Sequence, residues 1–83
     1  MNLVYTDYAE ETLLDRGVGK PDVERTICEP HSIVNGKKGR KIAQRIVGKK
    51  LLRVIYETET NAYIVITAYY ASIRRYLNNE NNC

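Results

Sequence analysis

Apolar and polar residues alternate along this chain with two different periods, and the change of period falls at Pro30. Before Pro30, apolar residues lie four positions apart, as in "YAEETLLDRG" and "PDVERTICEP", which is the spacing of one helix face. After Pro30 they alternate with polar residues, as in "RKIAQRIV" and "AYIVITAYY", which is the spacing of one strand face. The pattern therefore predicts helices first and strands second.

Two helices are predicted, over residues 6–17 and 20–30. Thr6 or Asp7 suits the N-cap of the first helix, and glycines follow its last turn. Pro21 suits the first turn of the second helix, and the next proline ends it.

Strands are predicted over residues 31–36, 40–47, 51–59 and 62–70. Gly48 and Lys49 form a plausible two-residue hairpin turn, and tight turns of this kind join antiparallel neighbours. A short last helix is expected in "ASIRRYL", within a single domain spanning residues 1–77. The polar tail 78–83 is expected to be disordered.

Helices that precede the strands predict an α+β fold, with two N-terminal helices packed on one face of a four-stranded antiparallel sheet. One choice of register points these side chains toward the helices: Ile42, Ile46, Val54, Ile64 and Ile66. The face without helices, here called the open face, then carries Arg45, Arg53, Tyr63, Thr67 and Tyr69. A slip of one residue reverses the assignment for a whole strand.

The charges of the chain are segregated. Its net charge is +3, and the following basic residues occur in the middle without an acid among them: Lys37, Lys38, Arg40, Lys41, Arg45, Lys49, Lys50 and Arg53. This basic segment favours an anionic partner. The chain also has seven tyrosines but no Phe or Trp, so each ring brings a hydroxyl that needs water or a partner.

Several classes of protein are disfavoured. Two cysteines and one histidine do not fill a tetrahedral zinc site without a carboxylate, so neither a metal site nor a cofactor is expected. Both cysteines are interpreted as free thiols of a cytoplasmic protein. The N-terminus lacks the features of a signal peptide, and the longest apolar stretch is too short to span a bilayer.

Ordered motifs over residues 3–70 carry a resemblance to a known family. "YAEETLLDRGVGKPDVERTICEP", the Gly48-Lys49 turn, "LRVIYE" and "IVITAY" resemble a family of small prokaryotic domains of unknown function that is similar to the RelE and BrnT toxins. The resemblance implies two helices and a four-stranded sheet, and a metal-independent ribonuclease toxin paired with an antitoxin. One departure is Tyr8, which precedes Ala9 where family members usually carry a histidine. Tyrosine is a poor base near neutral pH, so the chain is either an active toxin or a weakened descendant.

Metal-free cleavage of RNA requires activation of a ribose 2′-OH, stabilisation of a phosphorane and an acid for the leaving oxygen. Arg53 and Arg45 are candidates for the stabilising charge, since a guanidinium matches phosphate oxygens. Thr67 and Tyr69 are candidates for hydrogen bonds to phosphate or for stacking on a base, and Tyr8 is a candidate through its place in the family motif. Each of these residues is also ordinary on an exposed strand or helix.

Two further features have both a functional and an ordinary structural interpretation. The basic turn of Lys37, Lys38, Arg40 and Lys41 is a candidate for contact with phosphates of RNA or the ribosome, although most basic turns are simply solvated. His31 is the only imidazole, but its place between a helix and a strand favours a structural role.

Three functions stay open from the sequence. The first is a ribonuclease toxin, or its descendant, that acts on RNA with an antitoxin as partner. The second is a non-catalytic domain that binds nucleic acid. The third is a protein-interaction domain that uses the open face or a sheet edge. Stabilisation by a partner or by self-association is expected as well, because a chain of 83 residues buries only a thin core.

Overall fold

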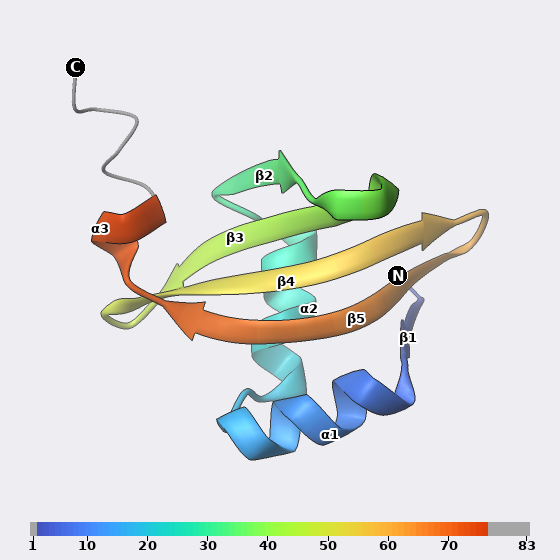
Figure 1. The fold of residues 1–83 in the computed structure, drawn as a ribbon, viewed down its shortest axis with the longest axis horizontal. Helices are drawn as coiled ribbons and strands as arrows, with labels where there is room; N and C mark the ends of the chain where they lie inside the picture. Colours follow the sequence, from blue (N-terminus) through green and yellow to red (C-terminus); the bar gives the residue numbers. More distant parts are fainter. Residues whose placement is uncertain (1, 77–83) are drawn as a thin grey trace.

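The computed structural model describes residues 2–76, which form an α+β fold of helices and a five-stranded sheet (Figure 1). In chain order the elements are β1 (Leu3–Tyr5), α1 (Asp7–Arg16), α2 (Lys20–Cys28), β2 (Ser32–Asn35), the 3-10 turn η1 (Lys37–Gly39), β3 (Lys41–Val47), β4 (Lys50–Glu59), β5 (Ala62–Ala71) and α3 (Ile73–Tyr76). The helices and the later strands confirm the prediction from period. The tail predicted over residues 78–83 lies outside the described residues.

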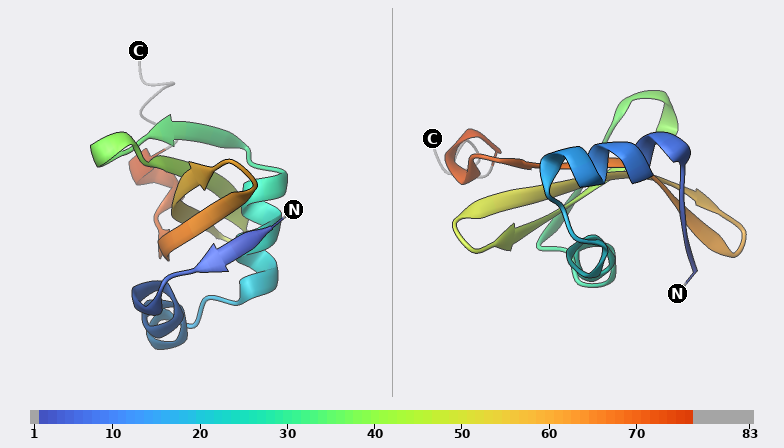
Figure 2. Two further views of the ribbon diagram at one scale, coloured as in Figure 1. Left: turned by 90° about the vertical axis from the view of Figure 1, so that its right-hand side faces the viewer. Right: turned by 90° about the horizontal axis from the view of Figure 1, so that it is seen from below.

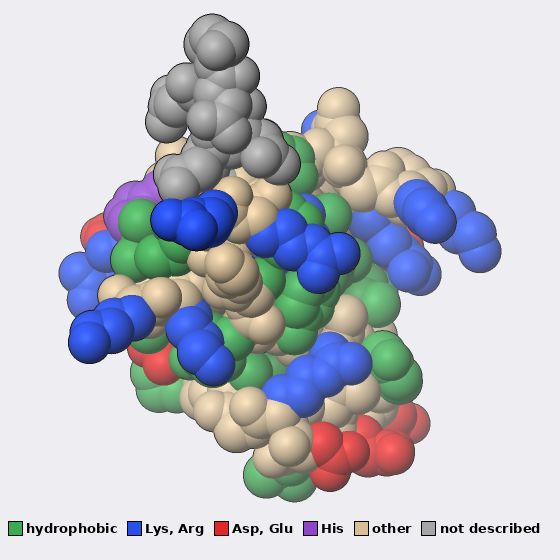
Figure 3. Space-filling model, turned by 60° about the vertical axis from the view of Figure 1, so that its left-hand side comes forward, with side chains coloured by type: hydrophobic (Ala, Val, Ile, Leu, Met, Phe, Trp, Pro, Cys, Tyr) green, Lys and Arg blue, Asp and Glu red, His purple; other side chains and the backbone are tan. Residues whose placement is uncertain are grey.

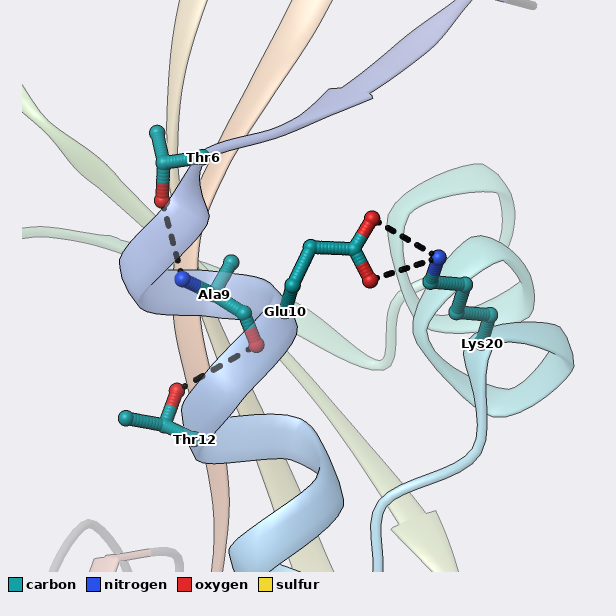
Figure 4. Close-up of polar contacts among 5 residues, drawn as sticks. All are labelled: Thr6, Ala9, Glu10, Thr12 and Lys20. Atoms are coloured by element: carbon teal, nitrogen blue, oxygen red, sulfur yellow. Dashed lines mark hydrogen bonds and ion pairs between the residues drawn. The ribbon is translucent and has the colours of Figure 1, made fainter.

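The first two helices begin and end where their residues predict. The Thr6 hydroxyl accepts a hydrogen bond from the N–H of Ala9 at 3.0 Å, which caps α1 (Figure 4). Gly17 ends α1 in the left-handed conformation, with φ of 65°. An ion pair of 2.8 Å between Glu10 and Lys20 joins α1 to the start of α2 (Figure 4).

The sheet has the order β1-β5-β4-β3-β2, and its strands are antiparallel except for β1, which runs parallel to β5. The prediction of four antiparallel strands is therefore wrong at this edge. β1 has only three residues, which is too few to show an alternating pattern. Backbone bonds from Tyr63 N–H to the Asn2 carbonyl (2.8 Å) and from Thr6 N–H to the Val65 carbonyl (3.2 Å) hold it beside β5.

The two long helices occupy different places around the sheet (Figure 2). α2 packs against β3 and β4 on one face, whereas α1 continues from the end of β1 and lies along β5. Among residues 2–76 no long helix covers the opposite face of β3 and β4, so an open face exists there as predicted.

Which residues point to the open face differs from the prediction. The core consists of Ala9, Leu13, Val18, Val23, Ile27, Ala43, Leu52, Val54, Tyr56, Val65 and Ala68. Of the five strand residues expected there, only Val54 belongs to it. On β3 the small Ala43 faces α2, which turns Ile42 and Ile46 to the open face.

An irregularity in β5 explains why the faces predicted for residues of this strand are partly wrong. Ile55 pairs with Thr67 but the next residue, Tyr56, pairs with Val65, so Ile66 is an extra residue in a bulge. The bulge interrupts the alternation along β5. A strict period of two therefore cannot assign both halves of this strand to the correct face.

Candidate nucleic-acid interface

A chain of polar side chains crosses the open face from β2 to β5. Alternation along β4 buries Leu52 and Val54 under α2 and points Arg53 the other way. Gln44 lies opposite Arg53 on β3, and Tyr69 lies opposite it on β5. Gln44 Nε2 also donates to the hydroxyl of Ser32 on β2 at 2.8 Å. Four strands thus fix the position of one guanidinium.

Arg53 is buried among neutral partners. Arg53 is only 9% exposed, and its Nε donates to Gln44 Oε1 at 2.7 Å. A second guanidinium N–H donates to the Tyr69 hydroxyl, and the ring of Tyr76 from α3 lies 3.9 Å from the guanidinium carbon. Among residues 2–76, no carboxylate lies within ion-pair distance of Arg53. Buried charges are normally paired, so this site has a positive charge in excess.

A second arginine approaches the same tyrosine from the end of α1. Arg16 Nη1 donates to the Thr67 hydroxyl at 3.0 Å and to the Ala68 carbonyl at 3.1 Å. Its guanidinium carbon lies 6.0 Å from the centre of the Tyr69 ring, and that of Arg53 lies 5.6 Å from it. Arg16, Tyr69, Arg53 and Tyr76 therefore form one group of neighbouring side chains, which is called here the arginine–tyrosine cluster.

The face of α1 beside the cluster carries two further residues of interest. The hydroxyls of Thr12 and Thr67 are 2.8 Å apart, which places Thr12 against β5. Tyr8 precedes Thr12 by four positions and Arg16 follows it by four, so all three share one face of the helix. Tyr8 is 56% exposed, and its ring is therefore free to meet a ligand that approaches this face.

The protonation of Tyr69 follows from its surroundings. Burial raises the pKa of the Tyr69 phenol above its usual value of about 10, while the neighbouring charge of Arg53 acts in the opposite direction. A hydrogen bond with Tyr76 raises the pKa further. At neutral pH the phenol is thus uncharged, and it can donate a hydrogen bond or a proton but does not serve as a base.

The structure brings together three of the predicted site residues and separates the others. Arg53, Thr67 and Tyr69 meet at the cluster. Arg45 does not, because it pairs with Leu52 on the side of α2 and donates to the Glu29 carbonyl at the end of that helix. The expectation that Arg45 shares the open face is wrong for the same reason as for Ile42, namely that Ala43 faces α2.

Tyr63 is also on the other face. It packs edge-to-face against Tyr56 with 5.7 Å between the ring centres, next to the core. The prediction that Tyr63 belongs to the open face is therefore wrong, and the bulge at Ile66 is the cause. His31 lies at the start of β2, where its Nδ1 accepts a hydrogen bond from the Ile46 N–H at 3.1 Å, in agreement with a structural role.

The basic turn lies apart from the cluster. Arg40 pairs with Glu57 at 2.9 Å, and the Lys41 ammonium donates to Asn35 Oδ1 at 2.8 Å. Lys37 and Lys38 are exposed in η1. Lys41 is three residues from Gln44 along β3, which corresponds to roughly 10 Å in a strand.

Three residues of the site were not predicted from the sequence, namely Gln44, Arg16 and Tyr76. Arg16 had a detectable signal, since it repeats the spacing of Tyr8 and Thr12 on α1. Tyr76 had no such signal, because it lies on a four-residue helix and contacts Arg53, a strand residue more than twenty positions earlier in the chain. Gln44 reads as an ordinary polar strand residue until its two partners are known.

The wider surface around α3 is rich in positive charge. Figure 3 shows many Lys and Arg side chains on this side, with acidic side chains mainly at its margins. Within residues 2–76 there is no group of three or more His, Cys, Asp or Glu side chains that could hold a metal ion. No helix in this part of the chain is both long and apolar enough to cross a membrane.

Comparison of the chain with models of known protein families, with curated proteins and with solved structures finds no match.

Proposed function

We propose that this protein binds RNA on its open face, where the arginine–tyrosine cluster holds a phosphate group and a base. The observation that carries the proposal is the guanidinium of Arg53, which is buried without a carboxylate partner among the described residues. An anionic ligand supplies the missing counter-charge, and Arg16 adds a second cation across Tyr69.

The combination of charge and aromatic rings at one place favours a nucleic acid over a simple anion. Bases unstacked from a single strand are bound by aromatic rings and by guanidinium planes, and the cluster offers both. Tyr69 and Tyr76 supply the rings, and Arg16 and Arg53 the planes. A sulfate or a metabolite phosphate needs the charge but makes no use of the rings.

The activity that we propose is metal-independent cleavage of RNA, as in a ribonuclease toxin paired with an antitoxin, or a weakened form of it. Two arginines at one place match the need to stabilise the extra charge of a phosphorane. The uncharged phenol of Tyr69 suits a donor of a proton to the leaving oxygen. The ribose 2′-OH is then activated by positioning and loses its proton to solvent water, because within residues 2–76 no carboxylate forms an ion pair with Arg16 or Arg53, and His31 bonds to Ile46 instead.

A second candidate, binding of RNA without cleavage, is favoured by this same lack of a base. Tyr8 stands on the helix face that leads to Thr12 and Arg16, where the resembling family usually has a histidine. Tyr8→His therefore tests whether a missing imidazole separates the two candidates.

The deciding experiment measures binding and cleavage on the same preparation. Anisotropy of a labelled single-stranded RNA should rise with protein and fall with salt, and a gel time course should show cleavage that persists with a chelator. Loss of cleavage with the chelator contradicts the metal-independent mechanism. Binding with no cleavage, for the parent and for Tyr8→His, leaves the second candidate. No binding at low salt contradicts both.

A further inference from the structure

We infer that the free edge of β2, together with an adjacent depression, is a docking site for an extended acidic segment of a partner protein. β2 is the last strand of the sheet, and no other described element lies beyond it (Figure 1). This inference does not depend on the binding of RNA, because the edge and the arginine–tyrosine cluster use different residues.

The direction of the backbone groups of β2 follows from its pairing with β3. The Gly36 N–H donates to the Arg40 carbonyl at 2.8 Å, which makes this a hydrogen-bonded pair. Hydrogen-bonded pairs recur at every second residue of an antiparallel ladder, so Val34 and Ser32 also bond to β3. The N–H and C=O groups of Ile33 and Asn35 therefore point outward and are free to pair with a further strand.

The depression beside this edge is apolar at its floor and basic at its rim. It has a volume of about 530 Å³ and is lined by Asn35, Gly36, Lys37, Arg40, Ile42 and Ile55. Ile42 and Ile55 pair across β3 and β4 and form the floor. Lys37 and Lys38 are exposed beside it, and within residues 2–76 neither has a carboxylate partner.

These features fit a peptide better than RNA. A strand edge supplies main-chain hydrogen bonds, and an apolar floor accepts a side chain of the added strand, as in recognition by strand addition. None of the residues that line the depression is aromatic, so a base finds no ring to stack on. The lysines of the turn select acidic side chains in the added segment, since opposite charges on neighbouring strands attract.

The test uses labelled peptides of alternating glutamate and valine as the probe, with alternating lysine and valine as the comparison. The glutamate peptide should raise anisotropy when protein is added, and the lysine peptide should not. Asn35→Pro removes an outward N–H without breaking a backbone bond to β3. Asn35→Ala keeps that N–H but removes the same side chain, and with it the same bond to Lys41. Asn35→Pro should weaken binding roughly five- to tenfold relative to Asn35→Ala, as expected for one backbone hydrogen bond.

Charge is tested by a matched pair of reversals. Lys37→Glu with Lys38→Glu should abolish binding of the glutamate peptide. Lys49→Glu with Lys50→Glu makes the same change of net charge in the β3–β4 turn and at the start of β4, and should leave most of the binding. Circular dichroism and a thermal melt establish that each variant is folded.

Four outcomes overturn the inference. The first is that Asn35→Pro and Asn35→Ala bind the glutamate peptide equally well, and the second is that the two charge reversals lose equal amounts of peptide binding. The third is that the parent binds no peptide and the reversal at Lys37 and Lys38 loses only RNA binding. The fourth is that the parent sediments as a dimer that Asn35→Pro dissociates. The third outcome makes the turn a nucleic-acid surface, and the fourth makes a second copy of the chain the occupant of the edge.

Discussion

The two faces of β4 show how differently one strand can be used. Toward α2, Leu52 and Val54 are completely buried in an apolar core. Between them Arg53 points to the open face, where it is almost as well buried but contacts only neutral groups. The covered face gains free energy from burial of apolar surface, whereas the open face buries a charge at a cost.

The difference indicates that the open face is shaped by something other than stability. A buried guanidinium bonded to an amide and a phenol loses hydration and gains no ion pair in return. Charged groups that are buried beside specific polar partners gather at functional sites, although structural networks also contain them. The two faces of β4 should therefore respond differently to substitution.

The largest effect is expected on the covered face. Leu52→Ala removes a side chain that is 0% exposed and should lower the free energy of unfolding by about 2–5 kcal/mol, because a cavity remains in the core. Ile55→Ala, on the open face of the same strand, should cost less than half as much since Ile55 is only partly buried. Urea denaturation of both variants measures the difference. Equal losses would mean that the open face is as well packed as the core.

The next effect is on function, at Arg53. If the protein cleaves RNA, Arg53→Ala should slow cleavage about a hundredfold, or roughly 3 kcal/mol of barrier, by analogy with loss of one donor to a developing oxyanion. Arg53→Lys should not restore the rate, because an ammonium lacks the planar fork. Single-turnover rates are compared with Arg45→Ala, which removes an arginine from the other side of β3 and should leave the rate unchanged. A folded Arg53→Ala protein that cleaves at the parent rate removes Arg53 from the site.

From the sequence, the helices and strands of this fold could be predicted better than the face to which each strand residue points. Period and end signals located α1, α2 and the later strands to within a few residues. The face that each strand turns to the helices depends on Ala43 being small enough to lie under α2, and on the bulge at Ile66, and neither has a local signal. β1 was missed because three residues do not define a period.

The site was predicted in part for a similar reason. Arg53, Thr67 and Tyr69 lie on strands whose alternation is visible in the sequence. Arg16 and Tyr76 come from α1 and α3, at opposite ends of the described chain, and only the folded chain brings them to one cluster. Contacts between such distant residues leave no trace in the local pattern of one sequence.

A smaller effect, of opposite sign, is expected when the polar pair of the open face is replaced. Gln44→Leu combined with Arg53→Met exchanges a buried charge and its amide partner for apolar side chains of similar length. Such replacements are often neutral or stabilising, and we expect a gain of about 1 kcal/mol, or roughly 4–8 °C in melting temperature. The same variant should bind no RNA. A protein that melts well below the parent would show that this pair stabilises the fold and would weaken the functional interpretation of Arg53.

The smallest effect concerns alkaline pH and again compares the faces. Burial raises the pKa of Tyr56 on the covered face and of Tyr69 on the open face above about 10, but Arg53 opposes the shift at Tyr69 and no cation does so at Tyr56. Above pH 10 the native protein then holds protons that the unfolded chain has lost, so its stability falls as the pH rises. Melting temperatures of Tyr56→Phe and Tyr69→Phe between about pH 8 and 11 should therefore decline less steeply than those of the parent. A decline as steep as that of the parent for either variant would mean that burial does not raise the pKa of that phenol in the folded protein.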